Sequence, residues 1–112
     1  MNHYTTPEQT AKLIELGFEK PCSIASVVPI YGIGGISVAK AYSIGELFEM
    51  LPSALSSNND EDCEFHLMLF DDSLYWHVRY ADGDNFCYPS QAIELIDALY
   101  DVIVLLKEEG VI

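Results

Sequence analysis

Apolar residues recur every three or four positions in three segments of the chain, which is the spacing of one face of an α-helix. The first segment begins at Thr6, and Gln9 three residues later completes the pattern of a capping box. It ends at Gly17, because glycine readily takes the left-handed conformation that closes a helix. A short helix is therefore predicted between Thr6 and Gly17.

A second short helix is predicted from Ser43, again with a capping-box residue, Glu46, three positions later. Pro52 should end or kink it, because proline removes a backbone donor and clashes with the preceding turn. The third helical segment is longer and runs from about Ser90 to Glu109. Its apolar positions extend almost around the helix, so this helix should be central to the core or covered by a partner chain.

Alternating apolar and polar residues between the second and third helices predict strands that form a β-meander over residues 64–88. If Asp71 and Asp72 form a tight turn, Leu69 lies opposite Leu74, and the alternation sorts the side chains onto two faces. One face would hold Phe65, Leu67, Leu69, Trp76 and Val78, and the other would hold His66, Met68, Tyr75, His77 and Arg79.

Residues 23–42 are rich in Ile, Val and Ala, and predict two short strands joined at Gly32–Gly35, or one strand and an extended loop. These glycines lack the spacing of a dinucleotide fingerprint, and no helix begins before Ser43, which favours a turn over a phosphate-binding loop. A further turn is predicted at Asp82-Gly83, and the polar residues 56–62 should form a loop.

These elements predict a single α+β domain over residues 1–112. An antiparallel sheet of about four to five strands, including the meander at 64–88, should carry the long C-terminal helix on one face, with two shorter helices flanking it. Hydrophobic residues make up 50% of the chain, which is enough to bury a core without disulfides or a metal.

The chain is strongly acidic, with 18 Asp and Glu residues against 5 Lys and Arg residues and a formal net charge of −13. Five scattered cations form no patch for phosphates, so neither direct nucleic-acid binding nor binding to an anionic membrane is expected. The charge is typical of a soluble acidic protein, or of an acidic face that meets a basic partner. No signal peptide is visible at the N-terminus, and a cytoplasmic location is predicted.

Candidate chemical sites are few. The three cysteines form no CxxC pair, which argues against a zinc ribbon and a disulfide framework. His66 and His77 would be cross-strand neighbours, but a zinc site needs further ligands. Cys87 would lie opposite Val78 and face the other side of the sheet, out of reach of His77. We therefore predict no catalytic residue, no metal ligand and no cofactor.

A protein partner is expected instead, and Tyr75 and Tyr88 could belong to its binding surface, because tyrosine is enriched at interfaces. The apolar excess of the last helix also suggests a homodimer. The candidate interaction residues are Tyr75, His77, Tyr88, Asp71, Asp72, Val104 and Leu105.

Three segments carry a family resemblance: "LIELGF" at Leu13–Phe18, the serine-capped "SIGELFEMLP" at Ser43–Pro52, and the long helix at Asp97–Gly110. They resemble segments of small uncharacterised acidic proteins of Bacteroidetes and their phages or mobile elements. The chain departs from that group at "VLLKEEG", where the group often has tryptophan. The group has no assigned activity, so the resemblance implies a shared fold and a mobile-element context, and it transfers no site.

The sequence thus predicts a small non-enzymatic interaction or accessory protein. The first alternative is an acidic inhibitor, or nucleic-acid mimic, of a basic DNA- or RNA-binding protein. The second is an enzyme, which would require a pocket holding His66 or His77 beside Cys87 or a carboxylate.

Overall fold

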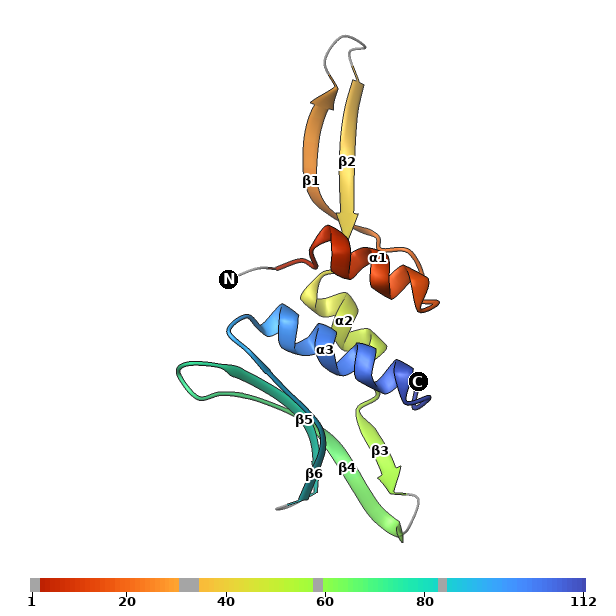
Figure 1. The fold of residues 1–112 in the computed structure, drawn as a ribbon, viewed down its shortest axis with the longest axis vertical. Coiled ribbons are helices and arrows are strands. Elements are labelled where there is room, and N and C mark those ends of the chain that lie inside the picture. Colours follow the sequence, from red (N-terminus) through yellow and green to blue (C-terminus); the bar gives the residue numbers. More distant parts are fainter. Residues whose placement is uncertain (1–2, 31–34, 58–59, 83–84) are drawn as a thin grey trace.

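The structure, a computed structural model, describes residues 3–30, 35–57, 60–82 and 85–112, without the side chains of residues 23–39 and 56–64. Within these residues, three helices and six strands follow one another along the chain (Figure 1). They are α1 (Pro7–Glu15), β1 (Ser23–Ile30), β2 (Gly35–Ala41), α2 (Ile44–Met50), β3 (Ala54–Ser57), β4 (Asp60–Asp71), β5 (Trp76–Asp82), β6 (Asn85–Ala92) and α3 (Leu95–Glu108). Strands β3 to β6 form an antiparallel sheet on which α3 packs, so the predicted α+β class is confirmed.

Both predicted capping boxes are present. In α1, the backbone N of Gln9 donates to Thr6 Oγ1 at 3.2 Å, and the backbone N of Thr6 donates to Gln9 Oε1 at 2.9 Å. In α2, the backbone N of Glu46 donates to Ser43 Oγ at 3.2 Å, and Ser43 N donates to Glu46 Oε1 at 3.1 Å. Gly17 follows α1 with a φ of 101°. These helix ends depend on a few neighbouring residues, which is why the sequence predicts them well.

The start of α3 differs from the prediction. The helix begins at Leu95, whereas its apolar periodicity predicts a start near Ser90. Ser90 and Ala92 belong instead to β6, where they lie opposite Val78 and Trp76 of β5. The predicted start is wrong because strand pairing satisfies the backbone groups of these residues, and a helical spacing of apolar positions cannot reveal that pairing.

The register of the β4–β5 hairpin also differs from the prediction. Leu69 lies opposite Val78 and not opposite Leu74. The connection is longer than two residues because Asp72 Oδ1 accepts hydrogen bonds from the backbone N of Leu74 at 3.0 Å and of Tyr75 at 2.8 Å. The partner of Leu69 moves from position 74 to position 78, an even number of residues, so the two predicted faces of the sheet are preserved.

The glycine-rich segment connects two strands, which confirms the first of the two predicted alternatives. β1 and β2 pair antiparallel and end at Ile30 opposite Gly35, while Gly32 and Gly34 lie outside the described residues. Because a strand and not a helix follows the glycines, no helix N-terminus is available there for a phosphate.

Two other predicted connections have different outcomes. The loop predicted over residues 56–62 is wrong, because β3 extends to Ser57 and β4 begins at Asp60. The two-residue turn predicted at Asp82-Gly83 would place Ala81 opposite Asp84, but Asp82 pairs with Asn85, so the connection lies one position later along the chain than predicted. The conformation of residues 83–84 themselves lies outside the described part of the chain.

α3 lies between the sheet and the two other helices (Figure 1). Gln9 Nε2 of α1 donates to Asp97 Oδ1 at 2.8 Å, and Lys12 Nζ lies 3.8 Å from Glu108 Oε1, so α1 contacts α3 near both of its ends. The apolar excess of α3 is therefore covered on two sides within the chain, as expected of a central helix. The core consists of Leu13, Tyr42, Leu47, Leu51, Val78, Tyr80, Leu95, Ile96, Ala98, Leu99, Val102, Ile103 and Leu106.

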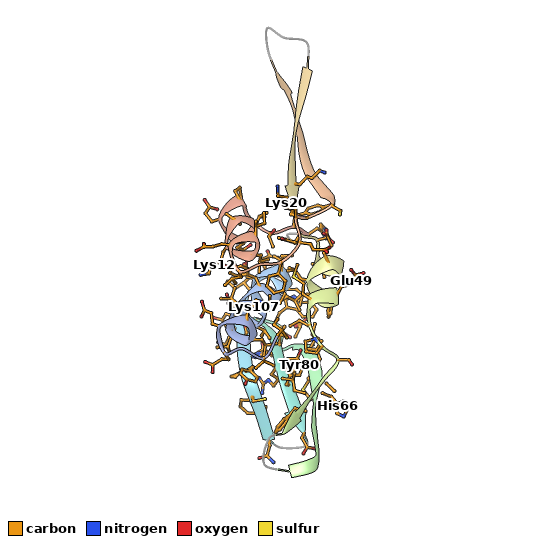
Figure 2. The ribbon with its side chains drawn as sticks, turned by 90° about the vertical axis from the view of Figure 1, so that its right-hand side faces the viewer. Lys12, Lys20, Glu49, His66, Tyr80 and Lys107 are labelled. Atoms are coloured by element: carbon orange, nitrogen blue, oxygen red, sulfur yellow. The ribbon has the colours of Figure 1, made fainter. Side chains whose placement is uncertain are left out.

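Tyr80 illustrates how the sheet joins this core. Its ring is fully buried beneath the helices (Figure 2), and its hydroxyl donates to the carbonyl oxygen of Pro52 at 2.7 Å. Burial, reinforced by Cys87, raises the pKa of Tyr80 to about 12. The hydroxyl therefore stays protonated and continues to donate this bond.

The β1–β2 hairpin projects from the rest of the fold (Figure 1). It forms a sheet of its own, and the molecule measures 62 × 32 × 17 Å along its principal axes. Its radius of gyration of 16.6 Å exceeds the roughly 13 Å expected for a compact chain of this length, as the projecting hairpin requires.

Candidate interaction face of the sheet

The four-stranded sheet has one face packed against α3 and a second face turned away from the helices (Figure 1). We call the second face the outer face, to which cross-strand pairing assigns His66, Met68, Phe70, His77, Arg79, Ala81, Phe86 and Gln91. Three large apolar side chains on it are exposed, at 41% for Met68, 39% for Phe70 and 53% for Phe86. Clusters of exposed apolar side chains mark sites of interaction.

The guanidinium of Arg79 is held between two phenylalanine rings of the outer face. Its Cζ lies 4.5 Å from the ring centroid of Phe86 and 5.0 Å from that of Phe70. Phe70 comes from β4 and Phe86 from β6, so Arg79 on the intervening β5 bridges three strands. Each cation–π contact contributes about 0.5–1 kcal/mol at a partly exposed site, and together they restrict the orientation of the guanidinium.

His77 is bonded at both of its ring nitrogens. The ring stacks on Phe70, with centroids 4.6 Å apart and 11° between the planes. Nε2 lies 2.7 Å from Asp72 Oδ2, and Nδ1 lies 3.4 Å from an Nη atom of Arg79. Because a guanidinium can only donate, Nδ1 accepts, and the proton of the neutral ring sits on Nε2, which donates to Asp72. Among the described residues, neither ring nitrogen is hydrogen-bonded to a hydroxyl or a thiol.

The Asp72 carboxylate anchors this arrangement. It accepts hydrogen bonds from His77 and from the backbone N of Leu74 and Tyr75. These hydrogen bonds lower the pKa of Asp72 from 3.8 to about 2. The bond from His77 is the largest cause, and the backbone bonds follow. The carboxylate is therefore charged at neutral pH and holds the His77 ring against Phe70.

A β-bulge in β6 lies opposite Arg79. The β5–β6 register shifts between Val78 and Tyr80, so that both Tyr88 and Pro89 oppose Arg79. Tyr88 has a φ of 52°, in the left-handed region that most residues avoid. A hollow of about 250 Å³ opens beside the bulge, lined by His77, Arg79, Pro89, Ser90 and Gln91. Arg79 Nε is buried, and no hydrogen-bond partner for it exists among the described residues.

Some of the predicted interaction residues meet at this face. Asp72 and His77 are bonded to each other, and Tyr75 lies in the adjoining loop with 39% of its surface exposed. Asp71 Oδ1 accepts a hydrogen bond from Ser73 N at 2.7 Å, so it shapes the same loop.

The remaining predicted interaction residues lie elsewhere. Tyr88 is partly buried and packs against the core from the bulge. Val104 packs against the core from α3, and Leu105 is half-buried on the same helix. These three residues do not belong to the outer face.

The side-chain alternation predicts that Arg79 lies on this face. The predicted interaction residues, however, do not include Arg79, Phe70 or Phe86. One signal for Arg79 is present in the sequence, because it is the sole arginine of a chain with 18 acidic residues. The contacts of Phe70 and Phe86 with Arg79 depend on strand register, which the sequence does not specify uniquely.

The predicted proximity of His66 and His77 is wrong. His66 lies opposite Ala81, whereas His77 lies opposite Phe70, further along the β4–β5 ladder. The longer loop after β4 moves the pairing and separates the two imidazoles. Among the described residues there is no group of three or more His, Cys, Asp or Glu side chains that could hold a metal ion.

Cys87 faces away from His77. It pairs with Tyr80 and not with Val78 as predicted, and it packs on the core side of the sheet, as the prediction requires. Burial raises the pKa of the Cys87 thiol, so the reactive thiolate is disfavoured. Cys87 and His77 therefore do not form a nucleophile–base pair.

Two larger hollows lie away from the outer face. One, of about 450 Å³, lies between the end of α1 and α2 and includes Phe18, Tyr42 and Met50 in its lining. The other, of about 840 Å³, lies between the sheet and the C-terminus and includes Cys87 and Ile112. Neither is lined by a histidine, so neither brings Cys87 together with His66 or His77.

Comparisons of the chain with protein-family models, with curated proteins and with solved structures found no match. In the described ranges, no helix is long and apolar enough to cross a membrane. The chemistry of the outer face is therefore the basis on which a function can be inferred.

Proposed function

We propose that this chain is a small non-enzymatic interaction protein of the bacterial cytoplasm, which binds a protein partner through the outer face. The observation that carries this proposal is the cluster of Phe70, Arg79 and Phe86 on a sheet face that no helix of the described chain covers. Arginine and aromatic residues dominate the energetics of protein interfaces, because they combine large contact area with directional bonds. A phage or mobile-element origin stays a prediction from the resemblance.

The enzyme alternative is supported less well by the same geometry. His77 does sit beside a carboxylate, Asp72, at the edge of a hollow. However, its second nitrogen faces the Arg79 guanidinium, which has no proton-accepting or nucleophilic atom. An acid–base pair of this kind needs a group to activate, and among the described residues no hydrogen bond joins His77 to a hydroxyl or a thiol.

A capture experiment with surface variants tests the proposal. The tagged chain is expressed in its native host, and the co-purifying proteins are quantified for the wild type and for Phe86→Ala. Phe86 is 53% exposed, so its truncation should leave the fold intact. We expect one partner to be retained by the wild type and depleted at least about tenfold with Phe86→Ala, the effect of losing ~1.4 kcal/mol.

Ile14→Ala is the matched control. Ile14 is a large apolar residue with 38% exposure, but it lies on α1 and not on the sheet. The control should retain the partner at the wild-type level. Equal retention by both variants, or loss with Ile14→Ala alone, would assign binding to another surface and overturn the proposal.

The acidic inhibitor or nucleic-acid mimic remains the alternative function, supported by the net charge of −13. It predicts a strongly basic partner, and binding that weakens steeply as salt rises, because the attraction would be long-ranged. A partner bound through apolar outer-face residues should instead show a shallow salt dependence. Measuring the partner's affinity between low and high salt separates these two modes.

A further inference from the structure

We propose that Arg79 is the receptor for a carboxylate of the partner, carried on a segment that also presents an apolar side chain to the phenylalanines around it. This inference rests on the proposed function, and it specifies the chemistry that the outer face recognises.

The charge environment of Arg79 is the first argument. Acidic residues outnumber cations 18 to 5 in this chain. Lys12 pairs with Glu108, but among the described residues no carboxylate lies within 4.0 Å of the Arg79 guanidinium. Its one hydrogen bond there is a long contact of 3.4 Å to His77 Nδ1, and its buried Nε has no partner. A guanidinium has five N–H donors, and the Nη donors that do not contact His77 can still bind an anion, although the buried Nε–H is out of reach.

The second argument is preorganisation. Phe70 and Phe86 restrict the guanidinium plane, and His77 contacts one of its nitrogens. An arginine restrained in this way loses little further side-chain entropy when it binds, and its planar fork matches the two oxygens of a carboxylate. The bulge at Pro89 leaves the hollow of about 250 Å³ open beside it.

The surroundings define the rest of the ligand. Met68, Phe70 and Phe86 offer exposed apolar contact area next to the cation. The exposed Asp71 and Asp72 border the same face, so a densely anionic ligand such as a nucleic acid would be repelled. The geometry thus favours a segment with a single carboxylate among apolar residues.

Docking through side chains is favoured over addition of a strand. β6 is the edge strand next to Arg79, but Pro89 cannot donate a backbone hydrogen bond, and the bulge interrupts the β5–β6 ladder at the same point. A second copy of the chain is also disfavoured, because stacking two outer faces on a two-fold axis would bring the Arg79 cations together.

Because Arg79 is the sole arginine, its Nε–H gives one unambiguous side-chain signal in the ¹H–¹⁵N spectrum of the labelled chain. The probe is N-acetyl-L-phenylalanine, which has one carboxylate beside an aromatic ring. Its matched control is N-acetyl-L-phenylalaninamide, which is the same molecule without the charge. We expect the carboxylate to shift the Arg79 signal saturably, with a dissociation constant on the order of millimolar, and the amide to leave it in place.

Two variants test whether the carboxylate binds at Arg79. In both, binding is followed through the backbone amide signals of Phe86 and Gln91. Arg79→Lys keeps the charge but loses the planar fork, and should weaken binding about tenfold. Lys107→Gln is the control, since it removes a cation that lies 5.4 Å from the Phe18 ring, away from the sheet. It should bind the probe like the wild type. The comparison of acid with amide needs no variant, so it holds even if Arg79→Lys is unstable.

Several outcomes would overturn this inference. They are equal shifts with acid and amide, equal affinity in Arg79→Lys, or a stronger shift with inorganic phosphate than with the carboxylate. If the wild-type chain has twice its monomer mass in solution and Arg79→Lys returns it to the monomer mass, the outer face would instead bind a second copy of the chain. If the captured partner depends on Phe86 but not on Arg79, the proposed function stands and this inference fails. Conversely, if the probe binds at Arg79 but no captured partner depends on Phe86, the carboxylate site stands and the proposed function fails.

Discussion

Asp72 organises its loop through one carboxylate. Its folded-state pKa of about 2 lies below the ordinary value of 3.8. A carboxylate with a lowered pKa contributes stability that is fully present above the unfolded-state value and is lost as the pH falls through the folded-state value. The contribution of Asp72 should therefore be complete above pH 3.8 and disappear toward pH 2.

Asp72→Asn isolates this charge, because the amide oxygen of asparagine can still accept the backbone hydrogen bonds. We expect the variant to be less stable at neutral pH, with a stability difference from the wild type that shrinks as the pH falls from 3.8 to about 2. Urea unfolding at a series of pH values, followed by Trp76 fluorescence, measures the difference. A difference that stays constant down to pH 2 would contradict the assigned pKa.

Two glycines should respond to alanine with opposite signs. Gly45 lies in α2, where an added Cβ would meet Ser43 Oγ at an ordinary 3.8 Å, so Gly45→Ala should stabilise the chain by about 0.5 kcal/mol. Gly17 has a φ of 101°, and Gly17→Ala should destabilise by about 1 kcal/mol, although no described atom crowds the new Cβ. Thermal unfolding of the two variants checks both signs, and a stabilising Gly17→Ala would refute the C-cap assignment.

At the scale of elements, local and non-local signals differ in reliability. The capping boxes of Thr6 and Ser43 are correctly predicted because all of their partners lie within four positions in sequence. The start of α3 is mispredicted because Ser90 and Ala92 pair with β5 as part of a strand. Tertiary pairing overrides local helical periodicity at such boundaries.

The β1–β2 hairpin should be locally less stable than the four-stranded sheet. In the described chain its strands pair only with each other, and a two-stranded hairpin is marginally stable in water. Its backbone amides should exchange with solvent at least about two orders of magnitude faster than those of the β4–β5 ladder, because they can open without global unfolding. Hydrogen exchange followed by NMR measures both ladders. Equal protection would indicate that another chain covers the hairpin.

At the scale of the whole molecule, the homodimer stays a prediction. α3 is covered by the sheet on one side and by the other helices on the other, and its partly exposed apolar residues are Tyr100, Val104 and Leu105. If these residues form an interface, light scattering should give twice the chain mass of 12.5 kDa, and a Leu105→Glu variant should reduce it. A wild-type mass near 12.5 kDa would contradict the dimer.

The sequence by itself determined the α+β class, the capped helices and the two faces of the sheet. These features follow from periodicity and from contacts between near neighbours. Only the tertiary structure decided that Arg79 stands between Phe70 and Phe86, and that His77 bonds Asp72 and not His66. The physical reason is strand register, which depends on a hydrogen-bonded loop and a bulge. Side-chain alternation cannot distinguish registers that differ by an even number of residues.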